Sequence, residues 1–289
     1  MIRCFVLCFF VFILTACNNT NNKETNNEPV YEKGSYGYDA VFLKKHAGNT
    51  LELENGDAKI LLSAAYQGRV FTSTAAGDSG TSFGWINYKL LEDSVKKTQF
   101  NPVGGEERFW LGREGGQYSI YFKKNDPFDF AHWQVPALIC AVAYKVDQSD
   151  KTSATISIAS SITNYTGTTF DIAITRSIHL LDKNAISEKL TILIPEIHKD
   201  GMYVNSKWEL QKQPFSGDVI NSYNDGPLQD GSQMGPFYEI ESSSPAKELK
   251  PGEIQEYHQT TIHLQGAYSS LKTLVQQLIH VDLEDVKKW

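Results

Sequence analysis

Hydrophobic and polar residues alternate with a period of two along much of the chain after residue 50, which predicts β-strands rather than helices. The first hairpin is predicted where Leu51 and Leu53 lead into Asn55-Gly56, a pair suited to a type I′ turn. The alternation resumes at Ile60 on the return strand. Shorter strands are predicted at residues 119–122, 190–194, 237–241 and 254–264.

The clearest alternation lies between residues 155 and 180. Ile156, Ile158 and Ile162 alternate with polar residues, and Asn-Tyr-Thr-Gly at 164–167 then turns the chain. The apolar face resumes from residue 170 to residue 180, with Asp171, Thr175, Ser177 and His179 on the opposite face. Two long neighbouring strands are therefore predicted.

Two segments have helical spacing instead. One short helix is predicted near Tyr38 to Lys45, and a second runs from Ser269 to Ile279 with its leucines and Val275 on one stripe. The fold predicted for residues 31–289 is a single all-β domain, an antiparallel sandwich closed by a short C-terminal helix. The stretch from Gln213 to Pro236 is predicted to be a long irregular loop, and such loops are often functional.

The N-terminal residues have the pattern of a bacterial lipoprotein leader. After Arg3, the run from Cys4 to Leu14 is almost wholly apolar and too short for a membrane span. It ends in Leu-Thr-Ala-Cys at 14–17, which resembles a lipobox and predicts a signal peptide at 1–16 and a lipid on Cys17. A plain signal peptide with an incidental cysteine is the alternative interpretation.

Residues 17–30 are predicted to be a tether, because residues 18–29 contain no apolar side chain and half of them are Asn. A lipid anchor with such a spacer places the β domain in the cell envelope. Asn18, rather than Asp, follows the cysteine, which favours the outer membrane, on either its periplasmic or its surface face.

Composition changes this picture in two respects. The chain is 41% hydrophobic and 21% charged with a net charge of −7, so it is globular and has no concentrated basic face for nucleic acid. Once Cys17 carries lipid and the leader is removed, only Cys140 remains, which excludes a disulfide framework within one chain. Cys140 lies in an apolar run and is predicted to be a buried structural thiol. We expect a monomer.

Several segments together resemble a known family. The blocks GGEERFWLGREGGQYSIYF at 104–122 and GPFYEIESSSPAKELKPGEIQEYHQTTIHL at 235–264 resemble an uncharacterised family of Bacteroidetes lipoproteins, a domain of unknown function. That family is related to the galactose mutarotase-like (aldose 1-epimerase) superfamily. The segment QGRVFTST at 67–74 resembles its early strand pair, and LKPGE at 249–253 resembles its closing strands. The resemblance implies a β-supersandwich with a concave sheet that faces a carbohydrate.

The resemblance also implies a candidate chemistry. Enzymes of the superfamily move protons at a sugar anomeric centre with a carboxylate base and an imidazole acid, without a cofactor. By position Glu241 resembles the base, and Glu239 lies two residues earlier on the same side of the strand. A strand face that is simply solvated is the alternative for this pair. His179 and His263 are the candidate acids, with a structural or surface histidine as the alternative for each. The chain has no match to the Asn-His-x-Tyr-Phe-Asn segment that supplies the enzymes' acid or to the Asn-Arg pair of their sugar clamp.

Other residues are candidates for binding the sugar. Glu106 and Arg108 share a face if their segment is extended, and an arginine fork can hold hydroxyls or a carboxylate. An internal ion pair that braces a turn is the alternative. Four aromatic residues are candidates for stacking on a sugar ring, with a place in the core as the alternative: Trp110, Trp133, Trp208 and Tyr223.

No metal site is predicted. The Asp- and Asn-rich run at 218–230 does not fit the EF-hand pattern, and neither zinc-protease spacing nor a Gly-x-Ser-x-Gly elbow occurs. The sequence thus favours an envelope lipoprotein whose mutarotase-like domain binds a carbohydrate or assists in glycan use. A cofactor-independent isomerase with a glutamate base and a structural lipoprotein with a vestigial site are the two alternatives.

Overall fold

The computed structural model describes residues 29–93, 97–112, 114–140, 142–181 and 189–287. Contacts divide the chain into the units Met1–Val30 and Tyr31–Trp289, and the structure described below belongs to the second unit. The predicted signal peptide and the lipid on Cys17 lie outside the described residues. Of the helices that are described, each is too short or too polar to span a bilayer.

The first sheet is three-stranded and antiparallel, in the order β1-β2-β3. Its strands are β1 (Thr50–Asn55), β2 (Ala58–Ser63) and β3 (Arg69–Thr74). Asn55 pairs with Ala58, so the predicted hairpin is confirmed, but its turn residues are Gly56 and Asp57. Only Gly56 has a positive φ, of 63°. The predicted type I′ turn, which needs two positive φ angles, is therefore wrong, and the pattern is that of type II′.

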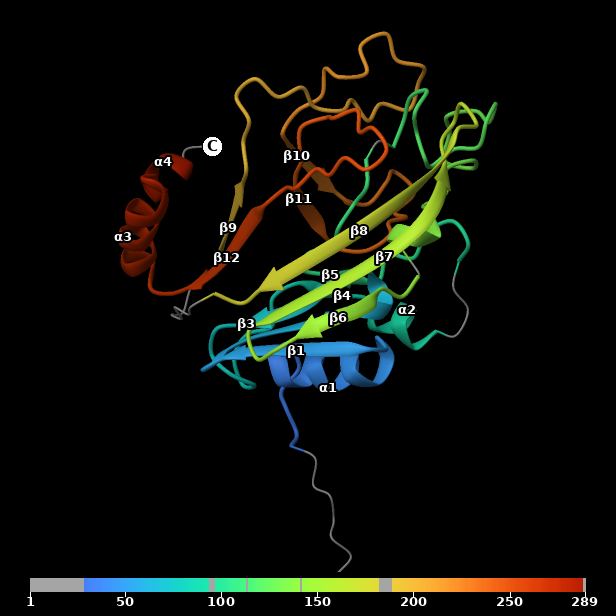
Figure 1. Cartoon of the computed structure of the whole chain (residues 1–289). Coiled ribbons are helices and arrows are strands. Elements are labelled where there is room, and N and C mark those ends of the chain that lie inside the picture. The colour runs from blue at the N-terminus through green and yellow to red at the C-terminus, as the bar shows by residue number, and fades with distance from the viewer. Residues whose placement is uncertain (1–28, 94–96, 113, 141, 182–188, 288–289) are drawn as a thin grey trace, which may run out of the picture. The chain divides into compact units, whose positions relative to one another are not determined.

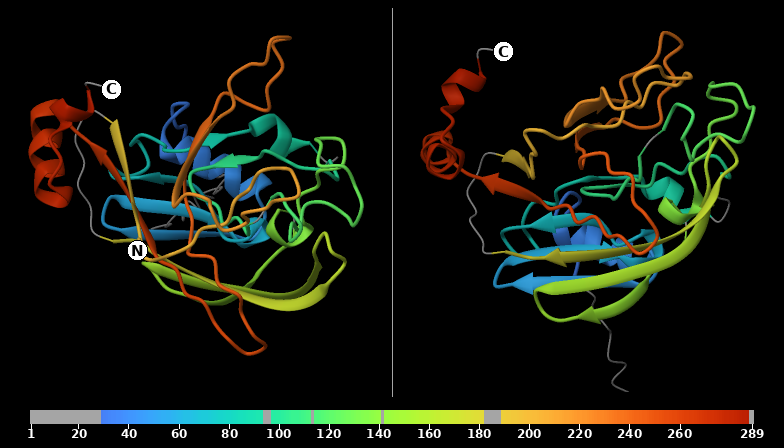
Figure 2. Two further views of the ribbon diagram at one scale, coloured as in Figure 1. Left: turned by 90° about the horizontal axis from the view of Figure 1, so that it is seen from above. Right: turned by 45° about the horizontal axis from the view of Figure 1, so that its top comes forward.

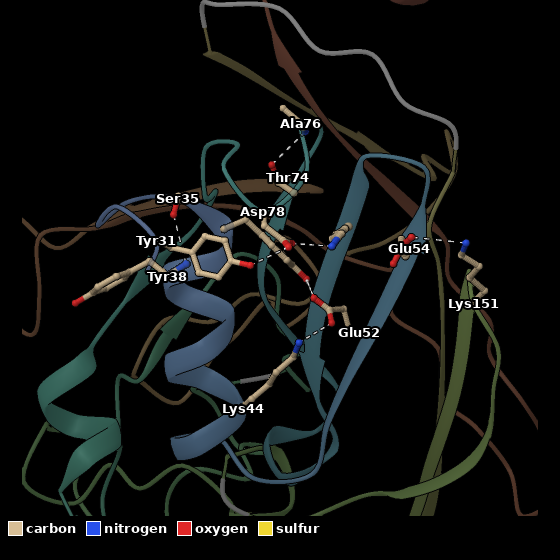
Figure 3. Close-up of polar contacts among 12 residues, drawn as sticks. Tyr31, Ser35, Tyr38, Lys44, Glu52, Glu54, Thr74, Ala76, Asp78 and Lys151 are labelled. Carbon is tan, nitrogen blue, oxygen red and sulfur yellow. Dashed lines mark hydrogen bonds and ion pairs between the residues drawn. The ribbon is translucent and has the colours of Figure 1, made fainter. Parts of the chain in front are cut away.

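Helix α1 (Tyr36–His46) covers one face of this sheet (Figure 1) and confirms the first predicted helix. Its buried Leu43 belongs to one apolar cluster with Leu61 of β2 and Phe71 of β3. The helix begins after Ser35, whose Oγ accepts a hydrogen bond from the Tyr38 N–H at 3.4 Å. Polar contacts at the rim include Lys44 Nζ to Glu52 Oε2 at 2.6 Å (Figure 3).

The second sheet is also three-stranded and antiparallel, in the order β6-β7-β8. Its strands are β6 (Lys145–Ser149), β7 (Ser153–Thr163) and β8 (Thr169–His179). β7 and β8 pair without interruption from Ser153↔His179 to Thr163↔Thr169, which confirms the two long predicted strands.

The two three-stranded sheets face each other across an apolar core (Figure 2). Leu53, Leu62 and Val70 of the first sheet belong to one apolar cluster with Ala154 of β7, and Ile178 of β8 packs against that cluster. The antiparallel all-β fold is thereby confirmed, and its physical basis is the burial of two apolar strand faces against each other.

Shorter elements complete the domain. They are β4 (Trp85–Ile86), α2 (Tyr88–Glu92), β5 (Gly104–Gly105), β9 (Lys189–Pro195), β10 (Ile220–Asn224), β11 (Tyr238–Ser242), β12 (Gln259–Gln265), α3 (Tyr268–Ile279) and α4 (Leu283–Val286), with 3₁₀ turns at Ala64–Tyr66 and Ala137–Ile139. The pairs are β4 with β5, β10 with β11, and β9 with β12. Leu271 and Val275 of α3 pack on Ile192 of β9 and Leu264 of β12 (Figure 1), so the predicted C-terminal helix is confirmed.

Three further sequence predictions are wrong in detail. Residues 119–122 form no strand, because the Tyr121 N–H donates to Ser119 Oγ at 3.0 Å while the Tyr121 ring lies in an aromatic core. The strand expected from residue 254 begins only at Gln259. Strand β10 lies within the stretch predicted to be irregular. All five of its residues are exposed, so its sequence has no apolar periodicity that would predict a strand.

Candidate functional site

Three consecutive residues, 106–108, join three different strands to one point of the domain. Glu106 contacts His263 of β12, Glu107 contacts Arg176 of β8, and Arg108 contacts Glu239 of β11. The segment is anchored on β3 because the N–H groups of Glu106 and Glu107 donate to the Val70 carbonyl at 2.8 and 3.1 Å, and the Val70 N–H donates to the Glu107 carbonyl at 3.0 Å. Residues far apart in the sequence are thereby brought together.

Arg108 is held between a carboxylate and an indole ring. Its Nη2 lies 3.2 and 3.3 Å from the two carboxylate oxygens of Glu239, and its Cζ lies 4.1 Å from the centroid of the Trp110 ring. A cation over an indole face is electrostatically favourable. The side chains of Arg108 and Glu239 are 20% and 29% exposed, so the pair is sheltered but not closed to a ligand.

The β10–β11 ribbon places four polar side chains on one face. Glu239 pairs directly with Tyr223, and Glu241 pairs with Asn221, whose Nδ2 donates to Glu241 Oε2 at 2.8 Å. Burial raises the pKa of Glu239, and the nearby charge of Glu241 raises it further, while Arg108 opposes both effects. The net result is a pKa of Glu239 above its ordinary value.

Glu114 bridges two tryptophans. Its Oε1 accepts a hydrogen bond from Trp110 Nε1 at 3.1 Å, and its Oε2 accepts one from Trp208 Nε1 at 3.2 Å. Burial raises the pKa of Glu114, against the two indole N–H groups and Arg108, which lower it. We call the connected set of side chains around these groups the Arg108 cluster; it comprises Arg108, Trp110, Glu114, Trp208, Glu239 and Glu241.

Removing the Glu114 charge is expected to change how stability depends on pH. A carboxyl whose pKa is higher in the folded state stabilises the fold most below its unfolded pKa of about 4.3, and this contribution is lost as the pH rises through the folded pKa. The wild type should therefore lose stability relative to Glu114→Gln as the pH rises from about 4. Urea unfolding across that range tests this, with Glu209→Gln as the control for loss of an exposed carboxylate. A difference that does not vary with pH would contradict it.

Three predicted site residues are not members of this cluster, although Tyr223 and Trp133 adjoin its members. Tyr223 faces Glu239, but its hydroxyl donates to Asp225 Oδ1 at 2.7 Å. Trp133 is buried, stacks on Trp208 at 5.8 Å and belongs to the aromatic core. His179 lies exposed at the end of β8, on the face opposite the apolar one.

Glu106 and His263 form a pair that is separate from the Arg108 cluster and has different neighbours. His263 Nε2 lies 2.5 Å from Glu106 Oε1, and its ring stacks on Phe83 at 4.4 Å. Glu106 and Arg108, which were expected to share a face, thus contact two different strands. Glu106 contacts β12 and Arg108 contacts β11.

Sequence reasoning did not single out Glu114 or Arg69, and it considered Asn221 only as part of the Asp- and Asn-rich run at 218–230. Glu114 follows Trp110 by four residues in an irregular segment, and Asn221 lies in an exposed strand, so neither has a periodic pattern around it. Arg69 is buried on β3, and burial together with Arg108 lowers its pKa to about 10. It also lowers the pKa of Glu239, which places its charge near the Arg108 cluster.

Neither a metal site nor the pocket coincides with the Arg108 cluster in the described part of the chain. Within the described ranges, no three or more His, Cys, Asp and Glu side chains are grouped so as to hold a metal ion. Asp225, in the Asp- and Asn-rich stretch, accepts hydrogen bonds from the Tyr223 hydroxyl and the Gly235 N–H instead. An open pocket of about 330 Å³ lies elsewhere, lined by His198, Lys199, Asp200, Gly201 and Pro245.

The fold and the Arg108 cluster define a class: an all-β protein of antiparallel sheets with a short C-terminal helix and a half-buried arginine–carboxylate site. The sequence matches the model of a family of unknown function (DUF6786) over residues 34–199 and 187–289, and the chain belongs to that family. No curated protein and no solved structure matches it significantly.

Proposed function

We propose that this protein is a cell-envelope lipoprotein, anchored through Cys17, whose β domain is related to the galactose mutarotase-like superfamily and binds a carbohydrate at the Arg108 cluster. Its role is glycan binding or an accessory step in glycan use, and the outer membrane is its proposed location. The binding proposal rests on the position of Arg108. Its Nη2 lies 3.2 Å from Glu239 Oε1, and its Cζ lies 4.1 Å from the centroid of the Trp110 ring.

The chemistry of sugars fits this arrangement. Neighbouring hydroxyls of a sugar pair well with carboxylates and with the fork of a guanidinium, because both groups offer two parallel hydrogen bonds. Aromatic faces at the same point can cover the apolar face of a sugar ring. Arg108, Glu239 and Glu241 supply the polar part of such a site, and Trp110 supplies an indole ring whose centroid lies 4.1 Å from Arg108 Cζ.

The test is calorimetric and thermal-shift titration of the full chain in detergent against neutral monosaccharides, amino sugars, uronic acids and oligosaccharides. A ligand that binds only the folded protein raises the melting temperature. Binding is expected to fall by about tenfold or more in Arg108→Met and in Glu241→Gln, because removing a charged hydrogen-bond partner costs roughly 1.5–3 kcal/mol.

Matched controls are Lys212→Met and Glu209→Gln, which remove exposed charges of the same signs outside the cluster. Binding that survives in both cluster variants would contradict this site. Silence across the whole panel would instead favour the structural lipoprotein with a vestigial site.

A second candidate function is a cofactor-independent isomerase of the aldose 1-epimerase type, with Glu241 as base. The observation in its favour is the pair of carboxyls two residues apart, in which burial raises the pKa of Glu239 beside Glu241. Two neighbouring carboxyls in different environments can serve as acid and base. Interconversion of the anomers of any bound sugar, followed by polarimetry, tests this, and Glu241→Gln should abolish turnover.

A further inference from the structure

A hydroxyl, an imidazole and a carboxylate form a continuous chain where the β9–β12 ribbon meets residue Glu106. Thr191 Oγ1 lies 2.9 Å from His263 Nδ1, and His263 Nε2 lies 2.5 Å from Glu106 Oε1. We call these three residues the Thr191 triad. A nucleophile within hydrogen-bond reach of a base, which a third group orients in turn, is the arrangement that activates hydroxyl nucleophiles.

The strand register explains why Thr191 and His263 meet. They are direct partners in the β9–β12 ladder, and the Glu196 N–H donates to the His258 carbonyl at 3.1 Å just beyond it. Since hydrogen-bonded and non-hydrogen-bonded pairs alternate in an antiparallel ladder, Thr191 and His263 form a non-hydrogen-bonded pair. Side chains of such pairs lie closest together, and their backbone N–H groups point away from the partner strand.

The base of the triad is held in place on two sides. The imidazole of His263 stacks on Phe83 with 23° between the ring planes, and the side chains of His263 and Glu106 are 14% and 9% exposed. The second oxygen of Glu106, Oε2, is buried without a hydrogen-bond partner, so the carboxylate depends on His263. A proton on Nε2 directed at the carboxylate leaves Nδ1 free to accept the Thr191 hydroxyl proton.

The nucleophile is open to solvent. Thr191 is exposed, and α3 packs on the opposite face of the ribbon through Ile192 and Leu264. Within the described ranges no strand pairs with the outer edge of β9, toward which the Thr191 N–H points. That N–H can donate to an oxyanion that forms at the Thr191 side chain.

We propose that Thr191 is an acyl-accepting nucleophile, with His263 as its base and Glu106 as a positioning residue, acting on small carboxylic esters. Thr191 Oγ1 attacks the ester carbonyl and its proton passes to His263 Nδ1. The bond to the leaving alcohol then breaks, and the alcohol takes that proton. Water, deprotonated by His263, hydrolyses the acyl-threonine and restores the hydroxyl. This activity is independent of the carbohydrate site proposed above.

The experiment is covalent labelling of the full chain in detergent with a fluorophosphonate, followed by peptide mass spectrometry. Thr191 Oγ1 is expected to displace fluoride from phosphorus, so that the label maps to Thr191. Labelling should persist in Thr191→Ser and disappear in Thr191→Val. Loss of the base in His263→Gln should slow it by about 100-fold or more.

Two further comparisons keep the outcome decisive. Thr175→Val replaces an exposed threonine of β8 and should label like the wild type. Valine suits an exposed strand position, so Thr191→Val is expected to keep the wild-type melting temperature. In Glu106→Gln, slower labelling should accompany a change in the ¹⁵N shifts of the His263 ring, which reports its tautomer. Absence of label on the folded wild type, or label that survives in Thr191→Val, overturns the proposal.

Discussion

Replacing Arg176 with methionine is expected to lower the free energy of unfolding by about 2–4 kcal/mol. Arg176 lies on the inner, apolar face of β8, where its Nη2 contacts the two oxygens of Glu107 at 2.8 and 2.6 Å and its Nη1 donates to the Gln67 carbonyl at 2.8 Å. Methionine would leave the Glu107 carboxylate half-buried without its counterion. The two side chains are 11% and 22% exposed, which keeps the expected cost below that of a fully buried pair.

Equilibrium urea unfolding measures this loss. Lys145→Met is the matched control, because Lys145 is 79% exposed and pairs with Asp147 at 2.7 Å. A surface pair of that kind contributes about 0–1 kcal/mol. Adding Glu107→Gln to Arg176→Met should recover part of the stability, since the uncompensated charge is then gone. If Arg176→Met alone is as stable as the wild type, the Arg176–Glu107 pair does not hold β8 to the 106–108 segment.

Gly104→Ala is expected to destabilise the protein by about 2–5 kcal/mol, because strain and a steric clash add together. Gly104 has a φ of +85°, and a Cβ there would lie 2.1 Å from the Trp85 carbonyl oxygen. Relief requires β5 to move away from β4, with which Gly104 pairs through Ile86. Because Glu106 and Arg108 follow directly, binding at the Arg108 cluster should weaken as well.

Gly77→Ala separates the two causes. Gly77 also has a positive φ, of +68°, but a Cβ there would meet nothing within 4 Å. This variant should cost only the backbone strain, about 1–2 kcal/mol. Thermal melting and urea unfolding of both variants give the comparison. Equal losses for the two would mean that β4 and β5 separate easily and that the clash at Gly104 has no consequence.

The elements that sequence reasoning found are those with a strong period. β7, β8 and α3 have regular apolar spacing because each buries one face, and burial is what places hydrophobic residues at every second or every third and fourth position. β10 has no buried face, so its sequence has no period. Residues 119–122 have the composition of a strand, but they bury their rings in an aromatic cluster and make a local hydrogen bond.

The candidate sites show the same division. The spacing of Glu239 and Glu241 by two residues in a strand is enough to put both on one side of β11, where the structure has them opposite Tyr223 and Asn221. Spacing could not tell which distant residue each side chain meets. Glu106 contacts His263 across 157 positions of sequence, and Glu114 bonds to Trp208 across 94.

The sequence by itself determined the all-β class, the principal hairpins and the C-terminal helix, because these follow from short-range periodicity and from the turn preferences of a few residues. Only the tertiary structure decided that residues 106–108 divide among β8, β11 and β12, that Glu114 joins two indoles, and that Thr191 faces His263. Those contacts arise from the packing of separate strand pairs, and no local pattern of residues predicts which strands will meet.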